Sequence, residues 1–249
     1  MKRLHFILIL LFIICSCKKK NKSLVKITGK NIAIDGTIPS SKKIDSIVAP
    51  YKEKIIGEMA KVMSYAPKDF TKENIQMQSI LGNLMADMCF EMANPIFNDK
   101  TKASIDFSMF NNGGLRASIS EGNVTKENAF KLMPFENEFV VVELSGEKVI
   151  ELINYFIEGK KAHPLSKNIL LKIKKDDYSL KINGKKFDKS KTYSVLTSDY
   201  LQNGGDRMYF FKDPIKLTKL DYKIRDAIVD YFKKVDTLKT VIDKRVIIE

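Results

Sequence analysis

The sequence predicts an α+β fold, with a mixed β-sheet and helices packed on it in a layered single domain. Apolar residues recur at helical spacing in some segments and alternate at strand spacing in others, and these segments follow no regular strand-helix-strand rhythm. With 44% hydrophobic and 29% charged residues in 249, the chain has the composition of a globular protein with a packed core. This composition argues against wholesale disorder and against a polytopic membrane protein.

Residues 1–16 have the pattern of a bacterial lipoprotein signal peptide. A basic start precedes an apolar run at 4–14, which is about half the length that a membrane-spanning helix needs. The small Ser16 precedes Cys17 as in a lipobox, so Cys17 is the predicted lipidation site. We therefore expect a lipid-anchored, extracytoplasmic protein of the bacterial cell envelope, on the periplasmic side or in the outer membrane. An ordinary secretory signal with incidental cysteines is the alternative.

Residues 17–38 are predicted to form a lipidated tether and a first strand region. Lysines at 18, 19, 20 and 22 are placed to contact anionic headgroups, and apolar and polar residues alternate over 24–35 as in a short strand or hairpin. The folded domain is assigned to residues 39–249. With Cys17 lipidated, Cys89 is the free thiol of the mature chain, which excludes a disulfide framework; its apolar helical surroundings predict a small core residue.

Apolar stripes predict the helices of the domain. The first helix follows Ser40 and Ser41 and is interrupted near Pro50. Further helices are expected at 77–92 and 146–158, and Asp221 is expected to cap the last one.

Apolar runs predict the strands, which dominate the C-terminal half. They are expected at 105–110, 139–144, 169–173, 193–197 and 246–248. Asn183-Gly184 comes directly after an alternating apolar segment and is a strong signal for a hairpin turn.

The net charge of +13 first suggests an anionic partner such as nucleic acid. Arginine, however, occurs only at positions 3, 116, 207, 225 and 245, and no basic stripe is interleaved with aromatic residues. Base and phosphate recognition favours the planar donors of arginine. We therefore predict a lysine-rich solvated surface and no nucleic-acid partner.

The two histidines exclude several enzyme classes. His5 falls in the signal segment, so His163 is the one imidazole of the mature chain. Zinc enzymes, binuclear metallohydrolases and Ser-His-Asp hydrolases depend on histidine as a ligand or base. We predict no catalytic residue, bound metal or cofactor in this chain, and we place His163, in a lysine-rich loop, on the surface.

Two Gly-Gly turns carry the candidate binding chemistry. Asn111, Gly113, Gly114 and Arg116 follow a predicted strand; the glycines allow close backbone approach to an anion and Arg116 is placed to bind phosphate. Taken alone, such a pair of glycines is more often a tight turn.

The second turn combines an aromatic residue, Tyr200, with Gly204, Gly205 and Asp206. A ring can stack on a base and a carboxylate can accept two ribose hydroxyls, which suits a nucleoside. Phe135, after Pro134, is the candidate second ring. Each aromatic residue alone is better explained as buried structure.

In these motifs the chain resembles the C-terminal domain of the 5′-nucleotidase and UDP-sugar hydrolase family. The shared features are Asn-x-Gly-Gly-Leu-Arg at 111–116, Pro-Phe-x-Asn at 134–137, Asn-Gly-Gly-Asp at 203–206 and the Gly-Asn-Leu helix at 82–87. Residues 76–78 lack the arginines that the family places before this helix, and Tyr200 stands where phenylalanine is usual.

The resemblance implies a role for each site residue. Phe135 and Tyr200 would hold the base, and Asp206 the ribose. Asn111 and Asn137 would bond the base edge or the sugar, and Arg116 would face the phosphate.

The resemblance also implies a division of labour. Full-length family members hold two metals in an N-terminal metallophosphatase domain, for which this chain has neither room nor histidines. We hypothesise that the chain presents nucleotide to a separately encoded metallophosphatase, which would hold the divalent metals, for dephosphorylation in nucleotide catabolism. Whether the chain is itself an enzyme is left open. A binding lipoprotein that scavenges nucleotides or nucleosides is the main alternative, and a self-sufficient phosphatase is disfavoured by the histidine count.

Overall fold

The structure is a computed structural model that describes residues 23–249, so the signal peptide and Cys17 lie outside the described residues. The chain divides into two units between Val48 and Ala49. In the first unit, residues 24–34 form no strand with any part of the chain that the structure describes. The strand predicted at 24–35 is therefore wrong, because an alternating pattern makes a strand only where a neighbour accepts its backbone hydrogen bonds.

Helix α2 (Lys42–Met59) contains Pro50 without interruption, so the predicted break is wrong. A proline removes one helical hydrogen bond, and here the remaining bonds continue the helix. None of the α2 residues is buried: Ile44, Ile47 and Tyr51 on the predicted apolar face are 60%, 59% and 70% exposed.

A four-stranded sheet organises the second unit. Its strand order is β2 (Phe107–Ser108), β8 (Thr192–Ser198), β4 (Glu138–Ser145) and β9 (Lys216–Lys223). β2 runs parallel to β8, whereas β4 pairs antiparallel with both β8 and β9. This mixed sheet, with helices packed on it, confirms the predicted fold class.

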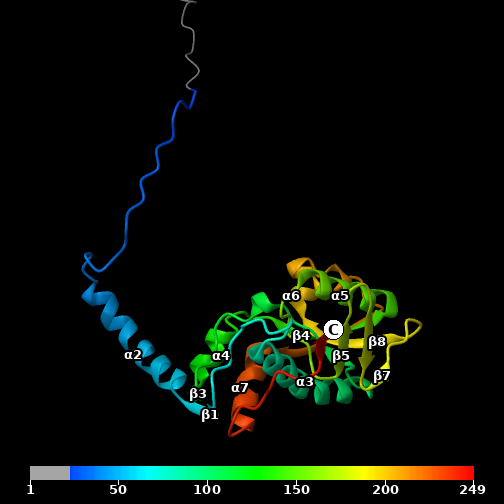
Figure 1. Ribbon diagram of the computed structural model, residues 1–249. Helices are drawn as coiled ribbons and strands as arrows, with labels where there is room; N and C mark the ends of the chain where they lie inside the picture. Colours follow the sequence, from blue (N-terminus) through cyan, green and yellow to red (C-terminus); the bar gives the residue numbers. More distant parts are fainter. Residues whose placement is uncertain (1–22) are drawn as a thin grey trace, which may run out of the picture. The chain divides into compact units, whose positions relative to one another are not determined.

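The central sheet is buried on both faces, which explains the apolar run of β4. Val141 belongs to a core cluster with α3 (Ile80–Thr101), α4 (Lys126–Leu132) and α7 (Ile224–Lys234). Val140 and Val142 belong to a second cluster with α5 (Gly146–Gly159). Successive side chains of a strand point to opposite faces, so one strand contributes to both layers. Figure 1 shows α3 and α7 on one side of β4 and α5 on the other.

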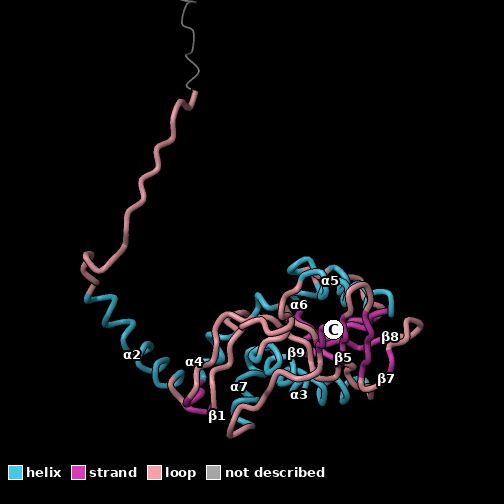
Figure 2. Tube along the Cα trace, in the orientation of Figure 1, coloured by secondary structure: helices cyan, strands magenta, loops and turns pink. Residues whose placement is uncertain are grey.

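A second four-stranded sheet completes the α5 layer. Its order is β10 (Val246–Ile248), β5 (Ile169–Ile173), β6 (Tyr178–Ile182) and β7 (Lys185–Lys186), with β10 parallel to β5. Asn183 and Gly184, with φ of 51° and 74°, form the predicted hairpin turn. A small antiparallel sheet, β1 (Val62–Ala66) with β3 (Gly122–Thr125), lies beside α4 and α7 (Figure 2).

Three boundary predictions need correction. The helix predicted at 77–92 begins only at Ile80, capped by Ser79, because Met77 has a φ of 62° that no α-helix accommodates. Of the strand predicted at 105–110, Phe107–Ser108 is a strand, and Met109 adds an isolated bridge to Leu165. Asp221 does not cap a helix but lies in β9, and α7 begins at Ile224 because pairing with β4 extends to Lys223.

Two predictions about single residues have opposite outcomes. Cys89 is buried in the core, as predicted. His163 is only 5% exposed, so its predicted place on the surface is wrong. Its ring packs against Tyr155 and Phe156 of α5, with centroids 5.6 and 6.3 Å away, and these contacts remove it from solvent.

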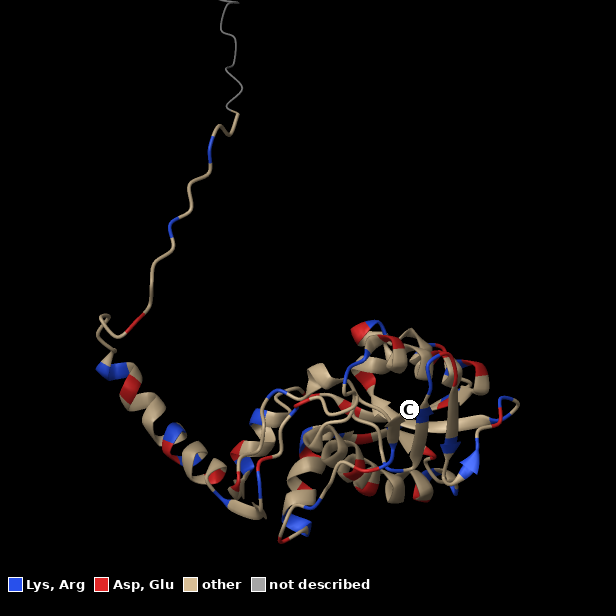
Figure 3. Cartoon of the chain, in the orientation of Figure 1, with Lys and Arg blue, Asp and Glu red and all other residues tan. Residues whose placement is uncertain are grey.

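Lysines and acidic residues are interspersed over the second unit (Figure 3). Several form exposed pairs, such as Lys131 with Glu127 at 2.8 Å. Such pairs contribute little to stability, so they indicate a solvated surface. Within residues 23–249, no helix combines the length and apolar character needed to cross a membrane.

Candidate functional site

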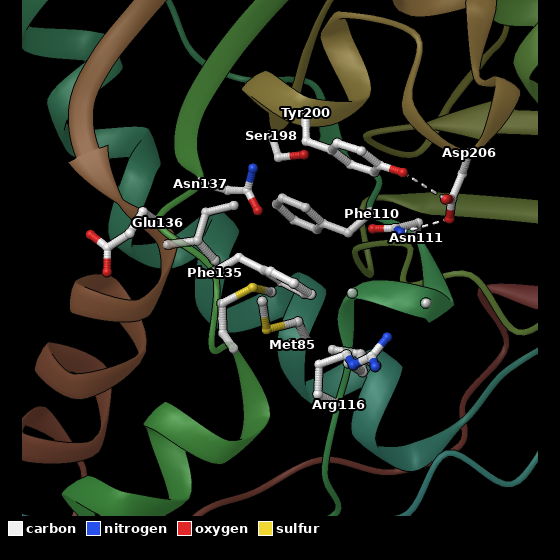
Figure 4. Close-up of a pocket in the computed structure, with 15 residues that line it drawn as sticks. Met85, Phe110, Asn111, Arg116, Phe135, Glu136, Asn137, Ser198, Tyr200 and Asp206 are labelled. Carbon is white, nitrogen blue, oxygen red and sulfur yellow. Dashed lines mark hydrogen bonds between the residues drawn. The ribbon is translucent and has the colours of Figure 1, made fainter. Parts of the chain in front are cut away.

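A pocket of about 590 Å³ opens where three segments of the second unit meet (Figure 4). These segments are the turn after β2, the loop between α4 and β4, and the chain from the end of β8 to the turn η2 (Gly205–Arg207). The lining residues are Met85, Phe110, Asn111, Gly113, Gly114, Leu115, Arg116, Met133, Phe135, Glu136, Asn137, Ser198, Tyr200, Asp206 and Ile224.

The turn after β2 places an amide and a cation at the pocket. Asn111 precedes the short helix η1 (Asn112–Gly114), and a Cβ added to Gly114 would lie 2.8 Å from the Asn111 Oδ1 atom. Glycine at 114 is therefore what lets the backbone approach this side chain. The backbone N–H of Arg116 donates to the Leu132 carbonyl at 2.9 Å. The Arg116 side chain is exposed and lies away from Asn111 and Asp206 (Figure 4).

The Asp206 carboxylate is held by hydrogen bonds to both of its oxygens. Asn111 Nδ2 donates to Oδ2 at 2.7 Å and the Tyr200 hydroxyl donates to Oδ1 at 3.0 Å (Figure 4). Asp206 and Arg207 have φ of 51° and 60°, the left-handed region that non-glycine residues rarely adopt. Hydrogen bonds to the side chain can stabilise such an unfavourable backbone conformation. Here they fix the Asp206 carboxylate at the pocket wall.

Tyr200 rests on a glycine. A Cβ added to Gly205 would lie 2.4 Å from Tyr200 Cε1, so the ring can occupy its place only because residue 205 has no side chain. Gly204, with a φ of 89°, turns the chain just before it. The two glycines do not line the pocket, but they position the ring that does.

Phe135 is the second exposed aromatic residue of the pocket, at 41% exposure beside 47% for Tyr200. The Arg116 guanidinium lies 5.8 Å from the centroid of the Phe135 ring. Phe110 and Met85 are buried and form an apolar floor, and Figure 4 shows Phe110 between Tyr200 and Phe135. Accessible rings over an apolar floor suit a flat ligand with an apolar face.

Asp199, which sequence reasoning missed, joins two of the three segments. Its Oδ1 accepts hydrogen bonds from Asn137 Nδ2 at 3.0 Å, from the Glu138 N–H at 3.2 Å and from the Tyr200 N–H at 2.8 Å. These bonds connect the loop that carries Phe135 with the turn that carries Tyr200. The Asn137 Nδ2 atom donates to Asp199, and the Asn137 Oδ1 atom can accept a hydrogen bond from a ligand.

Glu136 and Arg225 brace the Phe135 loop from the other side, and sequence reasoning missed both. Glu136 accepts from Lys223 at 2.6 Å and pairs with Arg225, and these two hydrogen bonds lower the pKa of Glu136 to about 2. Arg225 is buried, with its guanidinium 4.4 Å from the centroid of the Phe130 ring. In the sequence, the one sign of this cluster is the acidic Glu136 directly after Phe135.

The predicted binding residues are brought together. Asn111, Gly113, Gly114, Arg116, Phe135, Asn137, Tyr200 and Asp206 line one pocket, with Gly204 and Gly205 just behind it. In the stretch that lacks arginine, Gln78 is buried and donates to the Asp243 and Val246 carbonyls at 3.0 Å, a structural role. Chemically, the pocket offers stacking faces, a carboxylate, amides and a guanidinium. In the part of the chain that the structure describes, no group of three or more His, Cys, Asp and Glu side chains is arranged to hold a metal ion.

Comparison with known proteins defines the class. Residues 55–213 match the family described as 5′-nucleotidase, C-terminal domain, and the chain belongs to this family. Protein UshA of Escherichia coli (strain K12) is 33% identical over 43% of this chain and 20% of its own length. Cell wall protein Lmo0130 of Listeria monocytogenes is 25% identical over 79% of this chain and 27% of its own length.

The fold agrees with this assignment. The crystal structure of a 5′-nucleotidase precursor from Thermus thermophilus superposes with a TM-score of 0.66 at 19% identity, covering 82% of this chain and 42% of that chain. The chain therefore spans less than half the length of the relatives that it matches.

Proposed function

We propose that this chain binds a nucleotide and presents it to a separately encoded metallophosphatase for dephosphorylation, a step of nucleotide catabolism. The observation that carries the proposal is the convergence of Phe135, Tyr200, Asp206 and Arg116 on one pocket. These groups match the parts of a nucleotide in turn. The base would lie against Phe135 and Tyr200, the ribose hydroxyls would donate to Asp206, and Arg116 would bind phosphate.

The site is suited to holding a substrate rather than to cleaving it. The two carboxylates of the pocket, Asp206 and Glu136, already accept hydrogen bonds from neighbouring side chains, and its other charged group is the Arg116 cation. The described residues that line the pocket include no nucleophile paired with a base. Binding and orientation would be the contribution of this chain, and metal-assisted hydrolysis that of the partner. The description of the matched family as the C-terminal domain of 5′-nucleotidase supports a binding role for this domain.

Exposed apolar residues offer the partner a contact surface. Ile32 and Ile34 in the extended segment are 78% and 89% exposed, and the apolar face of α2 is uncovered. Isolated apolar residues are common on surfaces, but a row of them along one helix face is a surface on which a partner can bury apolar side chains. A lipid on Cys17 would hold the chain at the membrane, on the extracytoplasmic side, which suits a relative that is named a cell wall protein.

Hydrolysis measured on three samples tests the proposal. These are the purified chain, the candidate phosphatase and their mixture, with AMP as substrate and phosphate release as the readout. We expect the mixture to exceed the sum of the separate rates. No gain on mixing, with AMP binding intact, would favour a non-catalytic lipoprotein that scavenges nucleotides or nucleosides.

Affinity measurements test the binding site itself. Phe135→Ala should weaken AMP binding by about 1–3 kcal/mol, the range for loss of base stacking. Asp206→Ala should weaken AMP and adenosine alike, whereas Arg116→Ala should weaken AMP alone because adenosine lacks the phosphate. Unchanged affinity in all three variants would refute the nucleotide site.

A further inference from the structure

A tyrosine of α5 holds the main chain of Asp206. The Tyr155 hydroxyl donates to the Asp206 carbonyl at 2.9 Å, although Tyr155 is not among the residues that line the binding pocket. Asn111 and Tyr200 donate to the two carboxylate oxygens of the same residue. Asp206 is therefore bonded at its main chain and at its side chain, by residues from three separate segments.

Aromatic packing fixes the position of the Tyr155 hydroxyl. The centroid of the Tyr155 ring lies 5.4 Å from that of Phe210 and 5.6 Å from that of His163, and both neighbours are buried. Burial lowers the pKa of His163 to about 4, so this neighbour is an uncharged ring at neutral pH. Close packing restricts the rotamers of the tyrosine, so its hydroxyl stays aimed at the Asp206 carbonyl.

The Tyr155 hydroxyl is the donor of this bond. Burial and then the charge of Asp206 raise the pKa of Tyr155, so the phenol keeps its proton at neutral pH. A backbone carbonyl can only accept a hydrogen bond, which sets the direction of the interaction.

The backbone at Asp206 needs such a support. Asp206 and Arg207 have φ of 51° and 60°, and residues in this left-handed region persist only where their surroundings hold them. The Asp206 carbonyl belongs to the peptide group that joins these two residues, so the Tyr155 bond acts on the strained segment itself. Without this bond, the peptide group would be free to rotate and to carry the carboxylate away from the pocket wall.

The orientation of the Asp206 carboxylate decides what it can bind. A carboxylate has about four acceptor positions, and Asn111 and Tyr200 each use one, on different oxygens. One position then remains on each oxygen, which matches the two neighbouring hydroxyls of a ribose. Both hydroxyls can donate at once only if the carboxylate is already held in one orientation, and a preformed orientation lowers the entropy lost on binding.

We propose that Tyr155 is a positioning residue for ribose recognition, whose hydroxyl holds the Asp206 main chain so that the carboxylate meets both ribose hydroxyls. This inference rests on the proposed nucleotide site and defines its ligand class. The site selects nucleosides and nucleotides whose 2′ and 3′ hydroxyls are both free. Tyr155 acts through Asp206 and not by contact with the ligand.

Two nucleosides that differ only in these hydroxyls test the proposal. Tyr155→Phe keeps the packed ring and removes the donor. In calorimetric titrations of the whole chain, it should weaken adenosine binding about fivefold, as for one hydrogen bond, and leave 2′,3′-dideoxyadenosine binding unchanged. In an Asp206→Ala background, Tyr155→Phe should have no further effect on adenosine binding. An equal loss for both nucleosides would show a merely structural role, and that result or no loss at all would overturn the proposal.

Tyr209→Phe is the matched control. Tyr209 is 63% exposed and follows the same turn, where a Cβ added to Gly204 would lie 3.2 Å from the Tyr209 Cδ1 atom. Its side chain does not line the pocket, so the variant should bind both nucleosides as the wild type does.

An NMR measurement without ligand separates this proposal from the proposed function. A positive φ brings the amide proton of a residue close to its own Hα proton, so Asp206 should show a strong nuclear Overhauser effect between them. This effect should weaken in Tyr155→Phe, and an unchanged effect would overturn the positioning role. A weakened effect in a chain whose wild type binds neither nucleoside would uphold the hold of Tyr155 on Asp206 and refute the proposed function.

Discussion

Asp199→Ala is the most informative single substitution, because one carboxylate oxygen joins two loops of the binding pocket. That oxygen accepts from the Asn137 side chain and the Glu138 N–H of one loop, at 3.0 and 3.2 Å, and from the Tyr200 N–H of the other, at 2.8 Å. A hydrogen bond to a charged group contributes about 1.5–3 kcal/mol, with the lower value fitting this half-buried site. Loss of the two bonds to the Phe135 loop should therefore cost about 2–3 kcal/mol of unfolding free energy.

Urea unfolding of the variant measures this cost, and adenosine affinity measures its effect on the pocket. Asp199→Asn keeps an acceptor oxygen but loses the charge, so its cost should be about half that of the alanine variant. Asp176→Ala, at an exposed acid of the β5–β6 turn, is the control and should change stability by less than about 0.5 kcal/mol. Adenosine affinity should fall with Asp199→Ala because both aromatic residues lose their shared support. Wild-type stability and affinity in this variant would refute the reasoning.

Three further predictions concern the supports of the site. Gly205→Ala should weaken adenosine binding by about 1–3 kcal/mol, the range for lost stacking on Tyr200, because the new Cβ would meet the ring at 2.4 Å. Gly57→Ala is the control: a Cβ at this position meets nothing within 4 Å, so the variant should bind adenosine as the wild type does. Arg225→Leu should lower the free energy of unfolding by about 1–2 kcal/mol, because the contact of the guanidinium with Phe130 and its hydrogen bond to Glu136 are lost. Glu136→Gln should cost less, since Glu136 is exposed, and equal losses would contradict this ranking. The pKa of His163 is about 4 in the folded chain, so between about pH 6.5 and 4 the unfolded state binds one proton more than the folded state. The free energy of unfolding should therefore fall as the pH falls through this range, by about 3 kcal/mol at most. Urea unfolding of His163→Asn should lack this fall.

The binding motifs could be predicted from the sequence because their chemistry is local. Glycine pairs at 113–114 and 204–205 specify backbone turns, and the aromatic and acidic residues beside them specify what the turns present. The strands at 138–145 and 192–198 could also be predicted, since their short segments are rich in β-branched residues, which favour strand over helix. Local composition therefore indicated the parts of the site and the sheet that supports them.

Contacts between distant segments decided the rest, and the sequence contains little sign of them. His163 stands in a lysine-rich loop that predicts exposure, yet aromatic residues of α5 cover its ring. Asp221 has the residue type of a helix cap, but pairing of β9 with β4 continues two residues past it. Asp199 becomes recognisable only when Asn137 is found opposite, 62 residues away along the chain. Tertiary contacts overrode the local preference in each case.

The turn at 205–207 combines a strained backbone with a carboxylate that lines the pocket. Asp206 and Arg207 both adopt left-handed backbone, which costs roughly 1 kcal/mol or more for each residue. A glycine at 206 would remove part of this strain, but it would also remove the hydrogen bonds from Asn111 and Tyr200 that join the first turn to the second. The strained backbone places the Asp206 carboxylate at the wall of the pocket. Asp206→Gly should therefore weaken adenosine binding more than Arg116→Ala does, because Asp206 would accept from the ribose hydroxyls whereas Arg116 would bind the phosphate that adenosine lacks.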